Sequence, residues 1–265
     1  MATRGSSSAI GDRLVISERE TRDAPPHRIG LWHVGVVVST HTETPTGRSI
    51  VLDVPGWGGN LAGQHADVRL TASDGYQAVR SYSIASAGDS DRVELAVDRF
   101  PTGEVSPYLV DDLLPGDELE LRGPLGGWFV WKPTQTEPVQ LIGGGSGIVP
   151  LMAMIRSHTD SASTAPFRLL YSVRTSDDAF FRSELERPTP HLDVTWLYTR
   201  RVPDGWPRPA ARISLADLAA SAFASSLSPA VFVCGPTGFV ETVATDLVAL
   251  GHDPQRVKTE RFGGA

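Results

Sequence analysis

The stretch VQLIGGGSGIVPLMAMIRSH, residues 139–158, predicts the fold of the second half of the chain. Its apolar start at 139–142 is typical of a buried strand, and the glycine-rich loop that follows leads directly into a helical segment. Pro150 is expected at the first position of that helix, where a backbone N–H has no helical partner. A strand, a glycine loop and a helix in succession form one unit of a parallel sheet, which binds ligands beyond the carboxyl ends of its strands.

Three further units of the same kind follow along the chain. An apolar strand precedes a helical segment in FRLLYSV with DAFFRSELE, LDVTWLY with SLADLAASA, and AVFVC with GFVETVATDLVAL. Four strand-then-helix units predict a parallel sheet with helices on both faces. We assign this α/β domain to residues 137–265.

The first half of the chain has the periodicity of strands instead. In DRVELAV, Val93, Leu95 and Val97 share one face opposite Arg92, Glu94 and Asp98. Turn signals such as PGWGG and SAGDSD separate these short segments, as expected for a closed antiparallel sheet. We therefore predict an antiparallel six-stranded barrel at residues 27–133, preceded by a flexible tail at 1–26 and followed by a proline-rich connection.

Composition narrows the possible functions. The 265 residues contain one cysteine, which excludes a disulfide framework, a cysteine-ligated zinc site and a four-cysteine iron–sulfur cluster, so redox chemistry would need a bound organic cofactor. A net charge of −7 gives no general basic surface for nucleic acid. Neither a membrane span nor the apolar core of a signal peptide is visible, so we expect a cytoplasmic protein with no membrane partner and no metal site.

The segment RSYSIAS, residues 80–86, is the first candidate site. Arg80 and Tyr82 lie two residues apart and so share one face of a strand, and Ser83 adds a small donor or acceptor. The planar guanidinium of Arg80 suits a phosphate. Taken alone, the same residues also fit an ordinary surface strand.

Two further stretches offer backbone N–H groups to an anion. GEVSPYL, residues 103–109, places Gly103 and Ser106 at the expected start of a short helix, although Ser106 alone also fits a simple helix cap. The loop GGGSGIVP, residues 143–150, lets the backbone approach a ligand at a helix start. It departs from the G-x-G-x-x-G pattern by ending in Pro150.

In this order and spacing, these stretches together with VFVCGP, residues 231–236, resemble the ferredoxin-NADP reductase family of flavoproteins. The resemblance implies an FAD-binding barrel and an NAD(P)-binding α/β domain. It implies that Arg80 holds the FAD pyrophosphate, that Tyr82 lies against the flavin and that Ser83 bonds near flavin N5. The implied second pyrophosphate contact comes from Gly103, Val105 and Ser106, and the implied nucleotide loop contains Gly145, Ser146 and Gly147.

The end of the chain carries more of the same resemblance. Cys234, Gly235 and Pro236 match a motif that places a thiol beside the nicotinamide, and Glu260 matches a terminal carboxylate near flavin N5. Phe262 matches an aromatic residue that covers the flavin. The resemblance therefore implies catalytic roles for Ser83, Cys234 and Glu260. Composition alone also allows Cys234 to be a small hydrophobic core residue.

The choice of nicotinamide nucleotide depends on residues after the second and third strands. An arginine there suits the 2′-phosphate of NADPH, and an acidic residue suits the ribose of NADH. Arg174 follows the second strand, and Thr199 and Arg200, which follow the third, look like the Ser-Arg pair of NADP-dependent relatives. We predict NADPH ahead of NADH, although Asp177 and Asp178 argue for the reverse.

The expected function is that of an FAD-dependent reductase which moves a hydride between nicotinamide and flavin N5, then passes single electrons to a separate ferredoxin or oxygenase component. Two alternatives fit the same residues. One is a reductase of free flavin or another small acceptor, and the other is a ligand-binding regulatory subunit without turnover, since a fold alone does not establish an activity.

Overall fold

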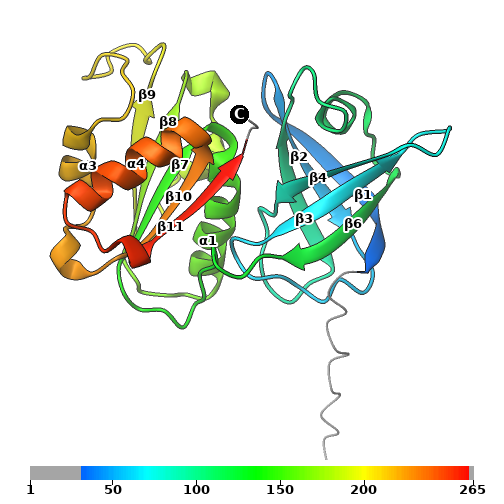
Figure 1. The fold of residues 1–265 in the computed structure, drawn as a ribbon, viewed down its shortest axis with the longest axis horizontal. Coiled ribbons are helices and arrows are strands. Elements are labelled where there is room, and N and C mark those ends of the chain that lie inside the picture. The colour runs from blue at the N-terminus through cyan, green and yellow to red at the C-terminus, as the bar shows by residue number, and fades with distance from the viewer. Residues whose placement is uncertain (1–30, 263–265) are drawn as a thin grey trace, which may run out of the picture.

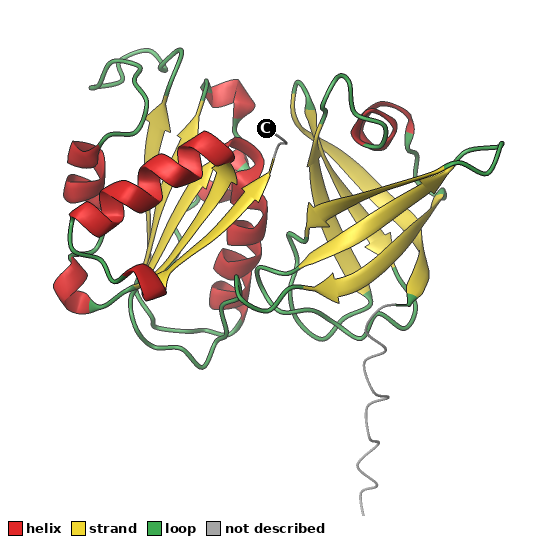
Figure 2. Ribbon diagram, in the orientation of Figure 1, coloured by secondary structure: helices red, strands yellow, loops and turns green. Residues whose placement is uncertain are grey.

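The computed structural model describes residues 31–262 and places two domains side by side (Figures 1 and 2). The predicted tail at 1–26 lies outside the described residues, as do residues 263–265. A barrel forms one domain, and a parallel sheet with helices forms the other. The predicted fold class is therefore confirmed.

The barrel is a six-stranded antiparallel sheet in the order β4-β3-β6-β1-β2-β5. Ile84, the residue after β4, bridges to Leu95 of β5 and closes the sheet on itself. Its strands are β1 (Trp32–Thr44), β2 (Gly47–Asp53), β3 (His65–Thr71), β4 (Gln77–Ser83), β5 (Arg92–Asp98) and β6 (Glu118–Leu125).

The strand periodicity fixes which side chains fill the barrel. Val93, Leu95 and Val97 are all buried in the barrel core, and Arg92 and Asp98 are exposed, as the alternation predicts. Glu94 is on the outward face yet only partly exposed. Its neighbour there is the second domain, so the barrel surface at this point is an interface.

A short π-helix, η1 (Tyr108–Asp112), follows β5 in the chain and packs against β2 and β5. After β6, Trp131 forms an isolated antiparallel β-bridge with Ala62 of the barrel. The parallel sheet then begins at Val139.

The second domain is a five-stranded parallel sheet in the order β11-β10-β7-β8-β9. The sequence pattern predicts four of these strands, and β11 adds a fifth at the edge beside β10. The strands are β7 (Val139–Gly144), β8 (Phe167–Val173), β9 (Leu192–Tyr198), β10 (Ala230–Pro236) and β11 (Val257–Phe262).

Helices cover both faces of this sheet. The α-helices are α1 (Ile148–Asp160), α2 (Arg182–Leu185), α3 (Leu215–Ser221) and α4 (Thr237–Ala249), and α3 and α4 lie together over one face (Figure 1). Ile142 packs into the core beneath α3 and α4, whereas its neighbour Leu141 packs with α1. Successive residues of a buried strand therefore serve opposite faces.

Two helix predictions need correction. Pro150 is the third residue of α1, because the glycine loop forms a 3₁₀ turn at Gly145–Gly147 and α1 begins at Ile148. Proline is tolerated throughout the first turn, where N–H groups lack helical acceptors. The helix expected in DAFFRSELE shrinks to the four residues of α2, since Phe181 before it has a left-handed backbone, with φ of 54°.

That left-handed residue belongs to the contact between the domains. The Phe181 N–H donates to Glu43 Oε2 of β1 at 2.9 Å. Next to it, the buried ring of Phe180 packs over Gly47 of β2, where an added Cβ would lie 2.7 Å from Phe180 Cε1 and closer still to Cζ. Gly47 is therefore required by the ring that covers it.

Candidate functional site

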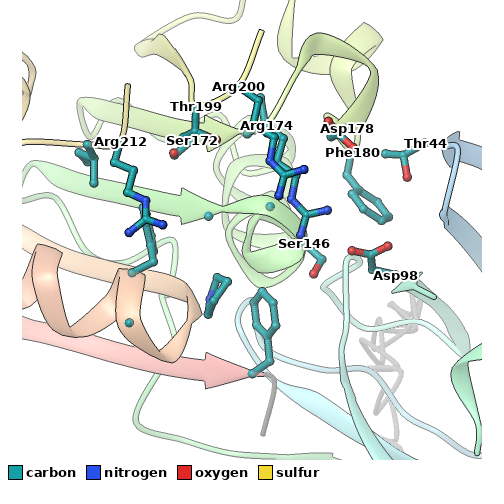
Figure 3. A pocket seen from close by; sticks show the side chains of 18 of the residues that line it. Thr44, Asp98, Ser146, Ser172, Arg174, Asp178, Phe180, Thr199, Arg200 and Arg212 are labelled. Carbon is teal, nitrogen blue, oxygen red and sulfur yellow. The ribbon is translucent and has the colours of Figure 1, made fainter. Parts of the chain in front are cut away.

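A pocket of about 590 Å³ opens at the carboxyl end of the parallel sheet, between the two domains. The glycine loop after β7 forms its floor, and Thr44, Thr46 and Asp98 of the barrel form one wall (Figure 3). Of the predicted site residues, seven line it: Gly145, Ser146, Arg174, Thr199, Arg200, Pro236 and Phe262.

The glycines of the loop have distinct steric roles. Gly145 has φ of 56° and nothing near its missing Cβ, so its backbone is open to a ligand. A Cβ at Gly147 would overlap the carbonyl of Cys234, and one at Gly144 would lie 2.9 Å from the Phe239 ring. The loop is thus pressed against β10 on one side and exposed to the pocket on the other, at a helix start that favours an anion.

Three arginines, Arg174, Arg200 and Arg212, face this pocket. In Figure 3 the side chains of Arg174 and Arg200 lie together above Ser146, and Arg212 approaches from the other side. Within residues 31–262 none of the three pairs with a carboxylate, whereas the nearby Arg201 pairs with Asp177 at 2.9 Å. Three unpaired guanidinium groups form a strong site for a phosphate dianion.

Arg212 is a site residue that the sequence reasoning missed. It lies 14 residues after the end of β9, in the irregular segment before α3. Its place in the pocket therefore cannot be predicted from the end of a strand. Asp178, which argued for NADH, does line the pocket, but its carboxylate accepts a bond from the Thr175 hydroxyl at 2.7 Å.

The barrel motif lies on β4. Arg80 and Tyr82 share one face of this strand, as the spacing predicts. Arg80 Nη2 pairs with Glu104 Oε2 at 2.5 Å, and the Tyr76 hydroxyl donates to the other oxygen of Glu104 at 2.8 Å. Arg80 therefore already holds an anionic group in a clamp that a phosphate would also fit. Burial raises the pKa of Tyr82 to about 12, so its hydroxyl stays protonated.

The GEVS segment sits directly beside this clamp. Val105 is buried in the barrel core, and the Ser106 hydroxyl accepts a bond from the Phe100 N–H at 3.0 Å. This bond closes the loop formed by residues 100–106. A Cβ added at Gly103 would lie 3.0 Å from the Ser106 hydroxyl oxygen, so the loop fits closely around Gly103. The bond from Phe100 replaces the helix cap that Ser106 alone suggested.

The parallel pairing of β10 and β11 places Cys234 directly opposite Glu260. Across the domain boundary, Glu260 Oε1 lies 3.8 Å from His65 Nδ1, and His65 is in turn the cross-strand partner of Ser83. Ser83 and Glu260 thus both lie beside His65, and Cys234 lies beside Glu260 on the neighbouring strand. The sequence reasoning did not single out His65.

Burial controls the charges in this cluster. Glu260 Oε2 is buried without a hydrogen-bond partner, and burial raises the pKa of Glu260 to about 7. Burial also lowers the pKa of His65, which is therefore neutral at pH 7 and provides no counter-charge. The pKa of Cys234 is raised first by burial and then by Glu260, so its thiol is protonated.

Cys234 itself does not reach the pocket surface. Its side chain is buried beneath the glycine loop, and Gly235 is equally enclosed, next to the Phe239 ring. Pro236 and Phe262, paired in register at the ends of β10 and β11, form the pocket wall above it. Residues 31–262 contain no cluster of three metal-ligating side chains and no helix long and apolar enough to cross a membrane.

Two family models divide the chain at the point where the structure divides it. An oxidoreductase FAD-binding domain matches residues 45–130, and an oxidoreductase NAD-binding domain matches residues 141–245. The chain belongs to the ferredoxin-NADP reductase family. Its barrel is thus an FAD-binding domain and its parallel sheet an NAD-binding domain.

Relatives of this reductase-family chain include components of oxygenase systems. It is 35% identical over 124 residues to the propane 2-monooxygenase reductase component of Mycolicibacterium smegmatis, covering 46% of this chain and 34% of that protein. It is 30% identical over 197 residues to the glycine betaine monooxygenase reductase subunit of Pseudomonas aeruginosa, covering 72% and 53%. The chain thus spans about a third to a half of these relatives' lengths.

A solved structure matches almost the whole chain. The flavohem-like FAD/NAD-binding domain of nitric oxide dioxygenase from Vibrio cholerae superposes with a TM-score of 0.75 at 25% identity, covering 89% of this chain and 100% of that one. The matched region includes both domains, so the arrangement of barrel and parallel sheet is shared.

The residues present fit both cofactors that the two domains bind. At the barrel, Arg80 presents its guanidinium on the same face of β4 as Tyr82, and the bonds of Arg80 and Tyr76 to Glu104 show that both side chains can donate to one anionic group. At the sheet, the open backbone of Gly145 and the unpaired arginines suit a phosphorylated dinucleotide.

Proposed function

We propose that this chain is an FAD-dependent oxidoreductase that transfers a hydride between a nicotinamide nucleotide and flavin N5. The observation that carries this proposal is the contact across the domain boundary between Glu260, the strand partner of Cys234, and His65, the strand partner of Ser83. FAD, when bound, supplies the hydride acceptor and allows electrons to leave singly.

The chain's own residues bind and orient the cofactors. Arg80 would exchange Glu104 for the pyrophosphate of FAD, and Tyr82 would offer its ring to the flavin. Gly145 and Ser146 would bind the nucleotide pyrophosphate at the start of α1. Holding two reacting atoms in contact accounts for much of the acceleration in such a transfer.

Glu260 is the residue that we expect to donate or accept a proton during the reaction. A carboxyl with a pKa of about 7 holds its proton and releases it at nearly equal cost near neutral pH, which suits a general acid or base. The protonated thiol of Cys234 packs against the strand that carries Glu260 and acts by position only.

The proposed nucleotide is NADPH rather than NADH. Arg174, Arg200 and Arg212 bring three positive charges to the pocket, none of them paired with a carboxylate within residues 31–262, and a 2′-phosphate is the group that distinguishes NADPH. Thr199 adds a hydroxyl beside Arg200. Asp178 is engaged with Thr175 and offers less to a ribose.

The proposed electron acceptor is a separate ferredoxin or oxygenase component. Relatives of this chain are reductase components of propane and glycine betaine monooxygenases. A pure protein with FAD alone is then expected to reduce ferricyanide readily and cytochrome c slowly until a ferredoxin is added. Rapid cytochrome c reduction that superoxide dismutase does not slow would contradict an obligatory partner.

Anaerobic mixing tests the activity directly. The purified protein is loaded with FAD and mixed with NADPH or NADH while flavin absorbance is followed. Bleaching within seconds by NADPH, and more slowly by NADH, is the expected result. A flavin that neither nucleotide bleaches would reject the proposed activity.

A further inference from the structure

Arg156 of α1 joins the nucleotide domain to the barrel. Its Nη1 donates to Glu94 Oε2 of β5 at 2.9 Å and to the Ala85 carbonyl at 3.2 Å, both in the barrel. Its Nε and Nη2 donate to Glu184 of its own domain at 2.9 and 2.7 Å. One guanidinium thus uses its planar fork to hold groups from both domains.

The elements that meet at Arg156 lead to the two candidate cofactor sites. Arg156 lies on the helix that starts at the glycine loop, two turns after Ile148. Ala85 lies two residues after Ser83, on the continuation of the strand that carries the flavin motif. A helix on one side and a strand continuation on the other therefore connect the nucleotide loop to Ser83 through this side chain. Figure 1 shows α1 at the edge of its domain that faces the barrel.

The Arg156 guanidinium is partly buried and packed as well as hydrogen-bonded. The Arg156 side chain is 24% exposed, and its guanidinium carbon lies 4.9 Å from the centre of the Phe181 ring. Although burial alone would lower it, bonds to Glu184 and the charge of Glu94 raise the pKa of Arg156, so it is always charged. The Glu43–Phe181 hydrogen bond adds a second cross-domain contact beside it.

We propose that Arg156 is a positioning residue that sets the distance between the nicotinamide and flavin sites by fixing the two domains to each other. It does not line the pocket at the carboxyl end of the parallel sheet, so its loss alters the rate of hydride transfer and leaves the affinity for each cofactor unchanged. This role rests on the proposed hydride transfer, because only a contact-dependent reaction is sensitive to the spacing.

The main test compares Arg156→Gln with Arg182→Gln. Arg182 is a matched control because it pairs with Glu186, the residue that follows its own short helix, and among the described residues no hydrogen bond or ion pair joins its side chain to the barrel. Flavin reduction by NADPH in a single turnover is expected to slow at least about tenfold in Arg156→Gln, since a displacement near 1 Å can cost about a hundredfold. Dissociation constants for FAD and NADPH are expected to stay within about threefold, and Arg182→Gln should match the wild type.

A second measurement needs no cofactor. Deuterium exchange of the apoprotein reports the Phe181 N–H, which donates across the boundary to Glu43. This amide is expected to exchange faster in Arg156→Gln and at the wild-type rate in Arg182→Gln. Faster exchange in the apoprotein supports the inference even if wild-type flavin is never bleached by NADPH, which would reject only the proposed activity.

A double variant keeps the test decisive if the single one unfolds. Arg156→Gln leaves the Glu94 carboxylate unpaired, so Arg156→Gln with Glu94→Gln removes both charges together. The double variant is expected to fold and to show the same slow reduction and fast exchange. Wild-type reduction and exchange rates in the double variant would overturn the inference, and so would a cofactor dissociation constant that changes more than the rate.

Discussion

Glu260→Gln should remove a pH-dependent loss of stability. Burial raises the pKa of Glu260 from 4.5 to about 7, so between these values the folded state keeps a proton that the unfolded state has released. The free energy of unfolding therefore falls as pH rises through this window and reaches its full loss above pH 7. Glutamine carries no such proton, and the variant lacks this loss.

The size of the effect follows from the shift. Each unit of pKa corresponds to about 1.36 kcal/mol, so a rise of this extent is worth on the order of 3 kcal/mol. The Glu260 side chain is 28% exposed, which makes this an upper value. Relative to about pH 5, the variant should gain up to that amount over the wild type at about pH 8. Burial lowers the pKa of His65, so its contribution to the free energy of unfolding rises with pH, opposite in sign to that of Glu260, and both proteins contain it.

Urea unfolding of the apoprotein, followed by tryptophan fluorescence at both pH values, measures the difference. Glu118→Gln is the control, because Glu118 is exposed on β6 and should change the pH dependence little. If Glu260→Gln and the wild type lose stability in parallel between the two pH values, Glu260 is ionised in the folded protein and the proposed proton-handling role fails.

Three further substitutions test the site. Arg80→Ala should purify largely without FAD while remaining folded, because a charged phosphate bond is worth roughly 1.5 to 3 kcal/mol; stoichiometric FAD after gel filtration would remove Arg80 from the site. Arg200→Ala should raise KM for NADPH about tenfold and leave KM for NADH nearly unchanged, and equal effects on both nucleotides in steady-state assays would contradict a 2′-phosphate contact. Cys234→Ala should keep the affinity for FAD and NADPH within a few-fold yet slow single-turnover flavin reduction about tenfold, and an unchanged stopped-flow rate would favour a purely structural thiol.

Much of the fold follows from short-range patterns in the sequence. The alternation of Val93, Leu95 and Val97 predicts their burial because one face of a strand must meet the barrel core. The glycine loop predicts the strand-to-helix turn because only that backbone allows so close an approach to β10. The shortening of α2 is not predictable in this way, since Phe181 adopts its left-handed backbone to reach Glu43, 138 residues earlier.

Arg212 and His65 are also not predicted from the sequence, because their positions depend on contacts between distant elements. Arg212 reaches the pocket from an irregular segment, where no periodicity places a side chain. His65 lies beside Ser83 and Glu260 only because β3 pairs with β4 and the edge strand β11 approaches from the other domain. Contacts between elements far apart in the sequence depend on how the two domains meet, and no local pattern records that.

The fit of Phe180 over Gly47 limits how this protein can be recombined with its relatives. A hybrid that joins this nucleotide domain to another barrel inherits a bulky ring aimed at one backbone position, and any side chain there would overlap it. The incoming barrel must also offer an acceptor in the place of Glu43. An exchange of whole domains would therefore need to include the β1–β2 hairpin that carries both residues, because without it the two domains would not pack against each other.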